Sequence, residues 1–292
     1  MATSKEIRKE IADIVIKQMK NAGTNWSKSW GGTLPTSKSS NKSYNGINYL
    51  LLSIYQNTFN YNSHEWATYN QWEKIGAKVK RGEKAKTVIF YKLIETQTVN
   101  VENISIDVKK FPILKSFKVF NADQVDNYVS PTKIGNKWKA NTLADTLSHD
   151  VNAIVNYSNG DRCYYTPSTD QITMTDIKHF NCKESYACTL LHELTHWTRN
   201  KADSTKRDFG KSSFGNESYA TEELVAELGS AMLAGQLGIS NSPRKDHAKY
   251  LNSWIKAISN DNSIIFKACS YADKASKYLL DLQAKNTLKQ AA

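Results

Sequence analysis

The sequence predicts an α+β protein of two domains, a small α/β domain followed by a mainly helical domain with a short sheet. Its 292 residues exceed one ordinary small domain and suit two. Helical periodicity recurs along the whole chain, whereas runs of β-branched and aromatic residues are confined to a few short stretches. Residues 129–140, with Pro131, Gly135 and several lysines, have the composition of a linker. We therefore expect domains at 1–128 and 141–292.

The first domain is expected to open with an amphipathic helix. Ile7, Ile11 and Val15 recur at helical spacing, with Ser4 in the N-cap position and Gly23 after the last turn. Two further helices and two strands follow. The expected elements are helices at 4–21, 48–58 and 68–75 and strands at 87–94 and 115–120, with an exposed hairpin or loop at 95–111.

The second domain is expected to hold one strand pair among helices. Turn residues bound each element, and apolar residues recur at helical spacing in the longer ones. The expected elements are a helix at 141–155, strands at 162–165 and 171–174, and helices at 183–199, 217–238, 245–259 and 263–283.

Basic residues are concentrated in the first domain. The net charge is +11, and residues 1–128 carry 19 Lys and Arg against 11 Asp and Glu. A localised basic surface interleaved with aromatic residues is typical of nucleic-acid binding, although a solvated basic face without a partner has the same composition. Charge alone leaves both interpretations open.

The four cysteines show no paired spacing, so we expect reduced thiols rather than disulfides or a metal cluster. No N-terminal apolar run of the signal-peptide type is present, and no stretch approaches 18 consecutive apolar residues. We expect a cytoplasmic protein without a membrane partner.

The stretch His192-Glu193-Leu194-Thr195-His196 is the most informative pattern in the chain. Residues four apart on a helix are separated by about 40° around its axis, so His192 and His196 project from one face and can share a metal ion. Glu193 lies beside them, where it can act as the general base toward a metal-activated water without ligating the metal. The pattern predicts a metallopeptidase helix; two hydrogen-bonded core histidines are the alternative.

A catalytic zinc site usually has three protein ligands and an open fourth position. Glu222, Glu223 and Glu227 follow His196 on an apolar helical stretch, in a spacing that resembles the thermolysin-like gluzincins. That resemblance implies Glu223 as the third ligand and Glu227 as the carboxylate that orients a ligand histidine, with Glu227 as the alternative ligand. We expect Glu222 to be a solvated first-turn residue. The expected cofactor is Zn²⁺, with Mn²⁺ as an alternative.

Peptide hydrolysis also needs a group that stabilises the developing oxyanion. His247, Tyr219 and Tyr250 are the candidates. On the helix expected at 245–259, His247 shares one face with Tyr250 and therefore points inward. A core histidine without a catalytic role is the alternative.

Short motifs in both halves carry a family resemblance. They are Trp26-Ser-Lys-Ser-Trp30, Tyr44-Asn-Gly-Ile-Asn48, Trp66-Ala-Thr-Tyr-Asn-Gln71, Val79-Lys-Arg-Gly-Glu-Lys84, Phe117-Lys-Val-Phe-Asn121, Tyr165-Thr-Pro-Ser-Thr-Asp170, His192-Glu-Leu-Thr-His-Trp197, Glu222 through Gly229 and Asp246-His-Ala248. With these motifs the chain resembles, over nearly its whole length, the ArdC antirestriction proteins of plasmids and phages.

The resemblance implies an N-terminal domain that binds single-stranded DNA and a zincin-like metallopeptidase domain, acting when incoming DNA meets host restriction. Aromatic rings would stack bases and cationic side chains would neutralise phosphates. For the tryptophans, an ordinary place in the core is the alternative. The candidate DNA-binding residues are Trp26, Lys28, Trp30, Lys42, Tyr44, Asn45, Lys80, Arg81 and Lys84, with Tyr49, Trp66 and Lys86 beside them.

The chain departs from the family pattern just after the second histidine. Where the family has a glycine and a histidine, this chain has Arg199 and Asn200. The catalytic residues are untouched, so the departure concerns the rim of the cleft and the choice of substrate.

We therefore expect an ArdC-like protein that binds single-stranded DNA and hydrolyses peptide bonds in an unidentified protein substrate. One alternative is a DNA-binding protector protein whose metal site is structural or inactive. Another is a toxin-like peptidase without a role at DNA.

Overall fold

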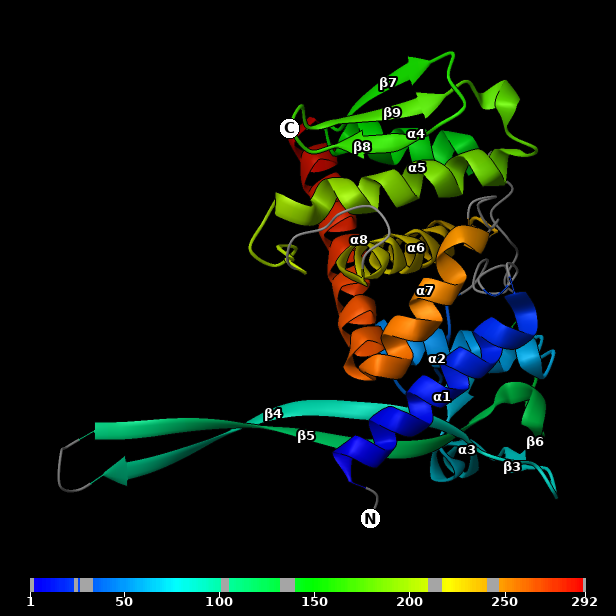
Figure 1. Ribbon diagram of the computed structural model, residues 1–292. Coiled ribbons are helices and arrows are strands. Elements are labelled where there is room, and N and C mark those ends of the chain that lie inside the picture. The colour runs from blue at the N-terminus through cyan, green and yellow to red at the C-terminus, as the bar shows by residue number, and fades with distance from the viewer. Residues whose placement is uncertain are drawn as a thin grey trace.

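The computed structural model describes residues 3–23, 26, 34–100, 105–131, 140–209, 217–240 and 247–290. For 92–100, 105–113, 217 and 247–249 it describes the backbone alone. A three-stranded sheet lies at one end of the molecule and a long hairpin at the other, with the helices between them (Figure 1).

The N-terminal half places three helices around a four-stranded sheet of order β1-β2-β5-β4 and a separate β3-β6 pair. Its elements are α1 Ser4–Ala22, β1 Thr36–Ser37, α2 Gly46–Thr58, β2 Glu65–Ala67, α3 Tyr69–Lys74, β3 Lys78–Val79, β4 Lys86–Asn100, β5 Ser105–Asn121, the 3-10 helix η3 Ala122–Gln124 and β6 Val125–Asp126. Thr3, not Ser4, caps α1, because its hydroxyl accepts from the Glu6 amide at 3.3 Å.

The β4–β5 hairpin is longer than the sequence pattern predicts. The strands pair antiparallel from Lys86 opposite Val119 to Asn100 opposite Ser105, so most of the expected loop at 95–111 is strand. Polar residues in this stretch favoured a loop, but two of them are threonines, and valines and isoleucines recur among the others; all three residue types favour strands. The resulting arm projects beyond the helices (Figure 1).

Asn48 anchors the edge strand β4 to helix α2. Its Nδ2 donates to the Ile89 carbonyl at 2.7 Å, and its Oδ1 accepts from the Ile89 amide at 2.8 Å. The side chain thus satisfies both backbone groups of one residue on a sheet edge, as a neighbouring strand would. This pair of hydrogen bonds fixes where the base of the hairpin meets the helical core.

The C-terminal half has a sheet of order β7-β9-β8 covered by helices. Its elements are α4 Ala140–Asp150, β7 Ile154–Ser158, β8 Tyr164–Thr166, β9 Gln171–Thr175, η4 Ile177–His179, α5 Lys183–Trp197, η5 Thr198–Asn200, α6 Glu217–Leu237, α7 His247–Asn260 and α8 Ser263–Gln290. The helix expected at 141–155 ends early, because Asn152 adopts a left-handed conformation and Ile154 begins a strand parallel to β9.

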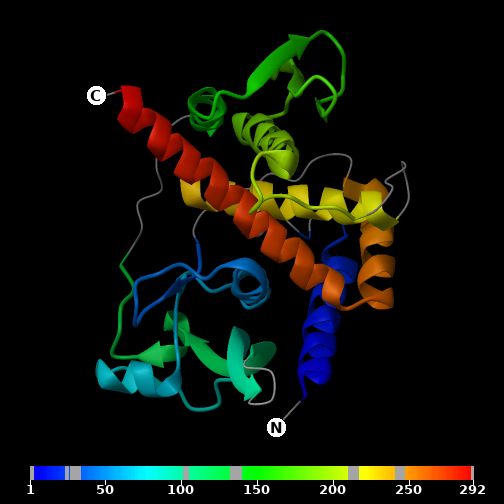
Figure 2. The ribbon, with the colours of Figure 1, turned by 90° about the vertical axis from the view of Figure 1, so that its left-hand side faces the viewer.

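The two halves share one hydrophobic core. Ile11 and Val15 of α1 and Leu50 of α2 belong to the same buried cluster as Leu224 of α6 and Ile258 of α7. Helix α8 packs against α2, α4 and α6, and Figure 2 shows it crossing from the C-terminal sheet toward the level of α1. The two halves, which the sequence separates by composition, therefore pack against each other through a common hydrophobic cluster.

Candidate metal centre

Helix α5 presents the two histidines and Glu193 from a buried position. Leu190, Leu191 and Leu194 are fully buried and hold the helix in the core. His192 and Glu193 are 3% and 2% exposed, so little bulk water competes for their polar atoms. The predicted buried helix is confirmed.

Helix α6 brings Glu223 opposite the two histidines through a close contact with α5. A Cβ atom at Gly229 would lie 2.5 Å from Cγ2 of Thr195, which stands between the histidines. The two helices can approach this closely only because residue 229 has no side chain. The glycine therefore sets the distance between the carboxylate and the imidazole rings.

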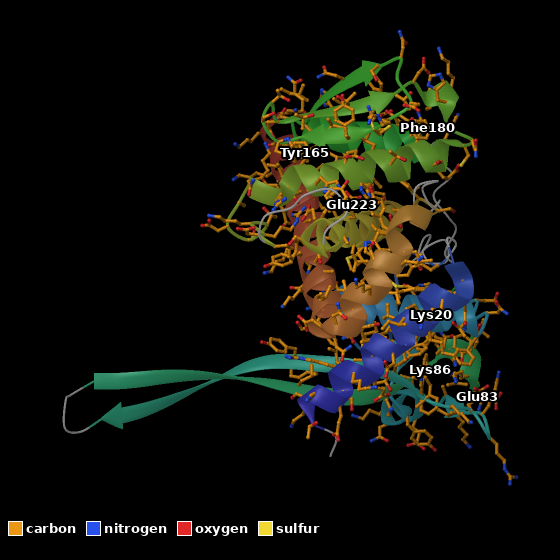
Figure 3. All side chains as sticks on the ribbon, in the orientation of Figure 1. Lys20, Glu83, Lys86, Tyr165, Phe180 and Glu223 are labelled. Atoms are coloured by element: carbon orange, nitrogen blue, oxygen red, sulfur yellow. The ribbon has the colours of Figure 1, made fainter. Side chains whose placement is uncertain are left out.

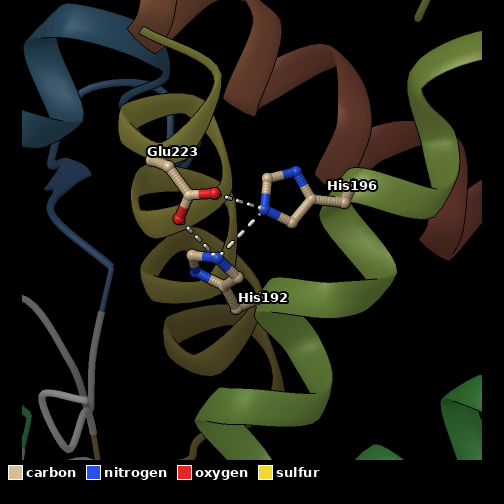
Figure 4. Close-up of side chains that lie close together, drawn as sticks. All are labelled: His192, His196 and Glu223. Carbon is tan, nitrogen blue, oxygen red and sulfur yellow. Dashed lines mark hydrogen bonds and ion pairs between the residues drawn. The ribbon is translucent and has the colours of Figure 1, made fainter. Parts of the chain in front are cut away.

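Three ligand atoms converge on one point (Figure 4). The Nε2 atoms of His192 and His196 are 3.1 Å apart, and they lie 3.5 and 3.6 Å from the two carboxylate oxygens of Glu223. Ligands at about 2.0–2.2 Å from a tetrahedral zinc ion are themselves about 3.3–3.6 Å apart. The donor set and its spacing therefore fit a divalent cation.

The protonation state of Glu223 suits this role. Burial opposes its charge, but the imidazole rings of His192 and His196 beside it hold the pKa of its carboxyl well below the usual range. The carboxylate form is the one that ligates metals.

Glu222 is not solvated, contrary to the expectation from its place in the first turn. It is 6% exposed, and Oε1 accepts a hydrogen bond from Nδ1 of His196 at 3.0 Å. Because a carboxylate only accepts, the proton of the neutral ring resides on Nδ1, and Nε2 keeps its lone pair for a metal. The carboxylate thus fixes the tautomer and the orientation of the ligand.

Arg207 holds Glu222 in turn. Its guanidinium donates to both Glu222 oxygens at 2.8 Å and to the carbonyl of Thr195 at 2.7 Å, at the C-terminal end of α5. Burial alone would raise the pKa of Glu222, but the hydrogen bonds with His196 and Arg207 lower it to about 2. Arg207 thus connects α6, through Glu222, with α5, through the Thr195 carbonyl, and its buried charge is fully hydrogen-bonded. The sequence analysis did not identify this residue.

Glu227 lies on the other side of the site. Its Oε2 is 3.8 Å from Nδ1 of His192, beyond hydrogen-bond distance. Glu227 therefore faces one of the two histidines, and its role in orienting a ligand histidine remains a prediction.

Of the three candidates for oxyanion stabilisation, the structure places two at the cleft and does not describe the side chain of the third. Tyr219 and Tyr250 line the same cleft as the metal ligands, and their hydroxyl oxygens are 3.4 Å apart. Burial, followed by the hydrogen bond with Tyr250, raises the pKa of Tyr219 well above its usual value, so the hydroxyl keeps its proton and can donate. The side chain of His247 lies outside the described residues.

The cleft has a volume of about 1180 Å³ and lies between α5, the β8 edge of the sheet and the first turn of α6. Figure 3 labels Tyr165 and Phe180 on the sheet side and Glu223 on the helix side. Ligand pockets for small molecules have volumes of about 300–1,000 Å³, so this cleft is slightly larger than that range.

The predicted DNA-binding residues fall into three groups. Trp26, Tyr49 and Trp66 are at most 1% exposed, so the expectation that these rings stack bases is wrong. Trp26 packs against Trp254 with ring centroids 5.6 Å apart, because the shared core needs large apolar side chains where the halves meet. The amine of Lys86 is also withdrawn, 3.2 Å from the ring centroid of Phe59.

The second group remains available to a ligand, and the third is not described. Lys42, Asn45, Arg81 and Lys84 are exposed, and Tyr44 is partly buried. Lys80 is also exposed, and its amine donates to the carbonyl of Asp123 at 2.9 Å. Lys28 and Trp30 lie outside the described residues.

The four cysteines are reduced thiols, as predicted. Within the described segments, no helix has the length and the apolar composition needed to cross a bilayer.

Comparisons with known proteins agree with this geometry. A zincin-like metallopeptidase model matches residues 142–271, and a model of the N-terminal domain of anti-restriction factor ArdC matches residues 5–120. The metal-free structure of the antirestriction protein ArdC from plasmid R388 is 32% identical, with a TM-score of 0.79 over 96% of this chain and 98% of that chain. Its Mn(II)-bound structure is 33% identical, with a TM-score of 0.75 over 95% and 98%.

Longer relatives also contain this unit. Two DNA primases TraC of Escherichia coli are 32% identical over 98% of this chain, which spans only 28% and 20% of their lengths. The fold and the site thus define a zincin-like metallopeptidase domain joined to an ArdC-type N-terminal domain. The chain belongs to the ArdC family of antirestriction proteins.

Proposed function

We propose that this antirestriction protein is a divalent-metal-dependent peptidase whose metal ligands are His192, His196 and Glu223. The observation that carries the proposal is the convergence of one ligand atom from each of these three side chains, all within 4.8 Å of one another, with Glu193 next to a ligand on the same helix. A divalent cation bound there supplies Lewis acidity and lowers the pKa of water. Zn²⁺ and Mn²⁺ both suit this donor set, and an ArdC relative binds Mn(II).

The residues of the chain would then share the remaining work. Glu193 accepts a proton from the attacking water and returns it to the leaving amine. Tyr219 and Tyr250 line the cleft with hydroxyl groups that can donate to an oxyanion. Glu222 and Arg207 keep the His196 ring in place during the reaction.

The test is a Glu193→Gln variant assayed on a mixture of defined peptides by mass spectrometry. Removing the general base should cost at least about 10²-fold in hydrolysis while folding and metal content stay unchanged. Glu184→Gln, on the first turn of the same helix, is the matched control and should cleave like the wild type. Equal cleavage by both variants would contradict the role of Glu193.

We also propose that the N-terminal half binds single-stranded DNA. Its family model, the DNA primase relatives and the exposed Lys42, Arg81 and Lys84 support this second function. The alternative is a protector protein that acts by binding alone. If Glu193→Gln still protects incoming DNA in a restricting host, turnover is not the protective mechanism.

A further inference from the structure

The N-terminal half exposes aromatic rings other than those that the sequence singled out. Phe90 and Phe117 are 51% and 45% exposed, although large apolar side chains normally reach the core. Their rings meet edge to face, with centroids 6.3 Å apart. They form a pair on the surface of the β4–β5 hairpin, near its base.

Strand register places these rings on one face. Phe117 pairs with Val88, and Phe90 pairs with Lys115, so all four residues project to the same side. Val88 is buried in a cluster with Leu52, whereas Phe90 and Phe117 lie beyond that cluster. We name Phe90, Lys115 and Phe117 the hairpin face.

The charge next to this face is positive. Residues 109–118 contain four lysines and no acidic residue, and one of them, Lys118, projects from the opposite side and donates to the Thr87 hydroxyl at 2.7 Å. Lys115 is exposed directly across from Phe90. Lys86, at the start of β4, is labelled in Figure 3. Its amine lies over Phe59, another exposed ring at 49%. Lys86 itself is buried, so Lys115 supplies the exposed cation of the hairpin face.

We propose that the hairpin face is a stacking surface for the bases of a single-stranded nucleic acid; this rests on the DNA-binding part of the proposed function. Each exposed ring offers a flat apolar face to a base, and Lys115 stands where a neighbouring phosphate would pass. Stacking on rings tolerates every base, so binding here has little sequence preference. A protein partner would use the apolar rings but would gain little from the lysines.

The test compares Phe90→Ala and Phe117→Ala with Tyr91→Ala in the full chain. Tyr91 follows Phe90, is 53% exposed and projects from the opposite face of the strand, so it is a matched control. Affinity for a fluorescein-labelled oligothymidine is measured by anisotropy. Each phenylalanine variant should weaken binding roughly five-fold or more, and Tyr91→Ala less than about two-fold.

A Phe90→Trp variant keeps the proposal testable if the alanine variants unfold. It should retain affinity, and its added fluorescence should be quenched by oligothymidine, whereas that of Tyr91→Trp should not. Equal effects at positions 90 and 91 would overturn the hairpin face while leaving DNA binding intact. Absence of binding by the wild type would contradict the proposed DNA binding itself.

Discussion

The metal centre and the basic N-terminal surface treat charge in opposite ways. At the metal centre, Arg207, Glu222 and Glu223 are buried and each is paired. On the N-terminal surface, Arg81 and Lys84 are exposed to solvent. Buried charges must be satisfied within the fold, whereas exposed ones remain available to a polyanion. The buried, paired charges hold the side chains of the first region in fixed positions, whereas the exposed charges of the second region can bind a ligand from solvent.

The largest expected effect comes from breaking the buried network. Arg207→Ala leaves Glu222 buried without its cation and should lower the free energy of unfolding by about 3–5 kcal/mol. The control is Arg162→Ala, an exposed arginine at the same cleft, which should change it by less than about 0.5 kcal/mol. Urea unfolding measures both. Similar curves for the two variants would mean that the network adds no stability.

A smaller effect should follow from widening the contact between the site helices. Alanine suits a helix better than glycine by about 1 kcal/mol, but at position 229 the clash with Thr195 should outweigh this and cost about 1–3 kcal/mol net. It should also weaken metal binding. At Gly235 of the same helix, an added Cβ would lie 3.0 Å from Cδ2 of Leu34, the movable end of a side chain, and at ordinary contact distance from Leu34 Cγ and the Tyr49 hydroxyl, so Gly235→Ala should be nearly neutral. Unfolding and metal titrations of both variants check this.

The smallest effect is expected on the exposed surface. Arg81→Gln with Lys84→Gln should leave unfolding unchanged and lower the salt dependence of single-strand binding, with the log-log slope falling by about 1.4 for two lost phosphate contacts. Lys285→Gln with Lys289→Gln removes the same charge from the end of α8. An equal slope change in that control would show that net charge, rather than this surface, determines binding.

The shared face of the two histidines could be predicted because helical spacing alone sets it. His192 and His196 share a face in any helix, and Glu193 follows automatically. The choice between Glu222 and Glu223 as neighbours of His196 depends on how α5 crosses α6, which no local pattern encodes. Arg207, the partner of Glu222, lies in the segment between η5 and α6. That segment has no helical or strand periodicity, so no sequence pattern pointed to this pair.

The three helices of the N-terminal half and the base of its hairpin were predictable, but its four short strands and its surface were not. Trp26 and Trp66 lie in a lysine-rich and a polar context, yet both are buried because the halves and the sheet close over them. Phe90 and Phe117 lie in strand patterns typical of a core and remain exposed. Which aromatic ring reaches solvent depends on tertiary packing, so a sequence window could not decide it.

The most direct test of the metal centre is calorimetric titration of the metal-stripped full chain with Mn²⁺ and with Zn²⁺. The wild type should bind a single ion. Glu223→Gln should abolish binding, and Glu222→Gln should weaken it only about 10–100-fold, because Glu222 orients a ligand without being one. A wild type that binds neither ion, or a Glu223→Gln variant that binds as tightly as the wild type, would contradict the assignment of His192, His196 and Glu223 as the metal ligands.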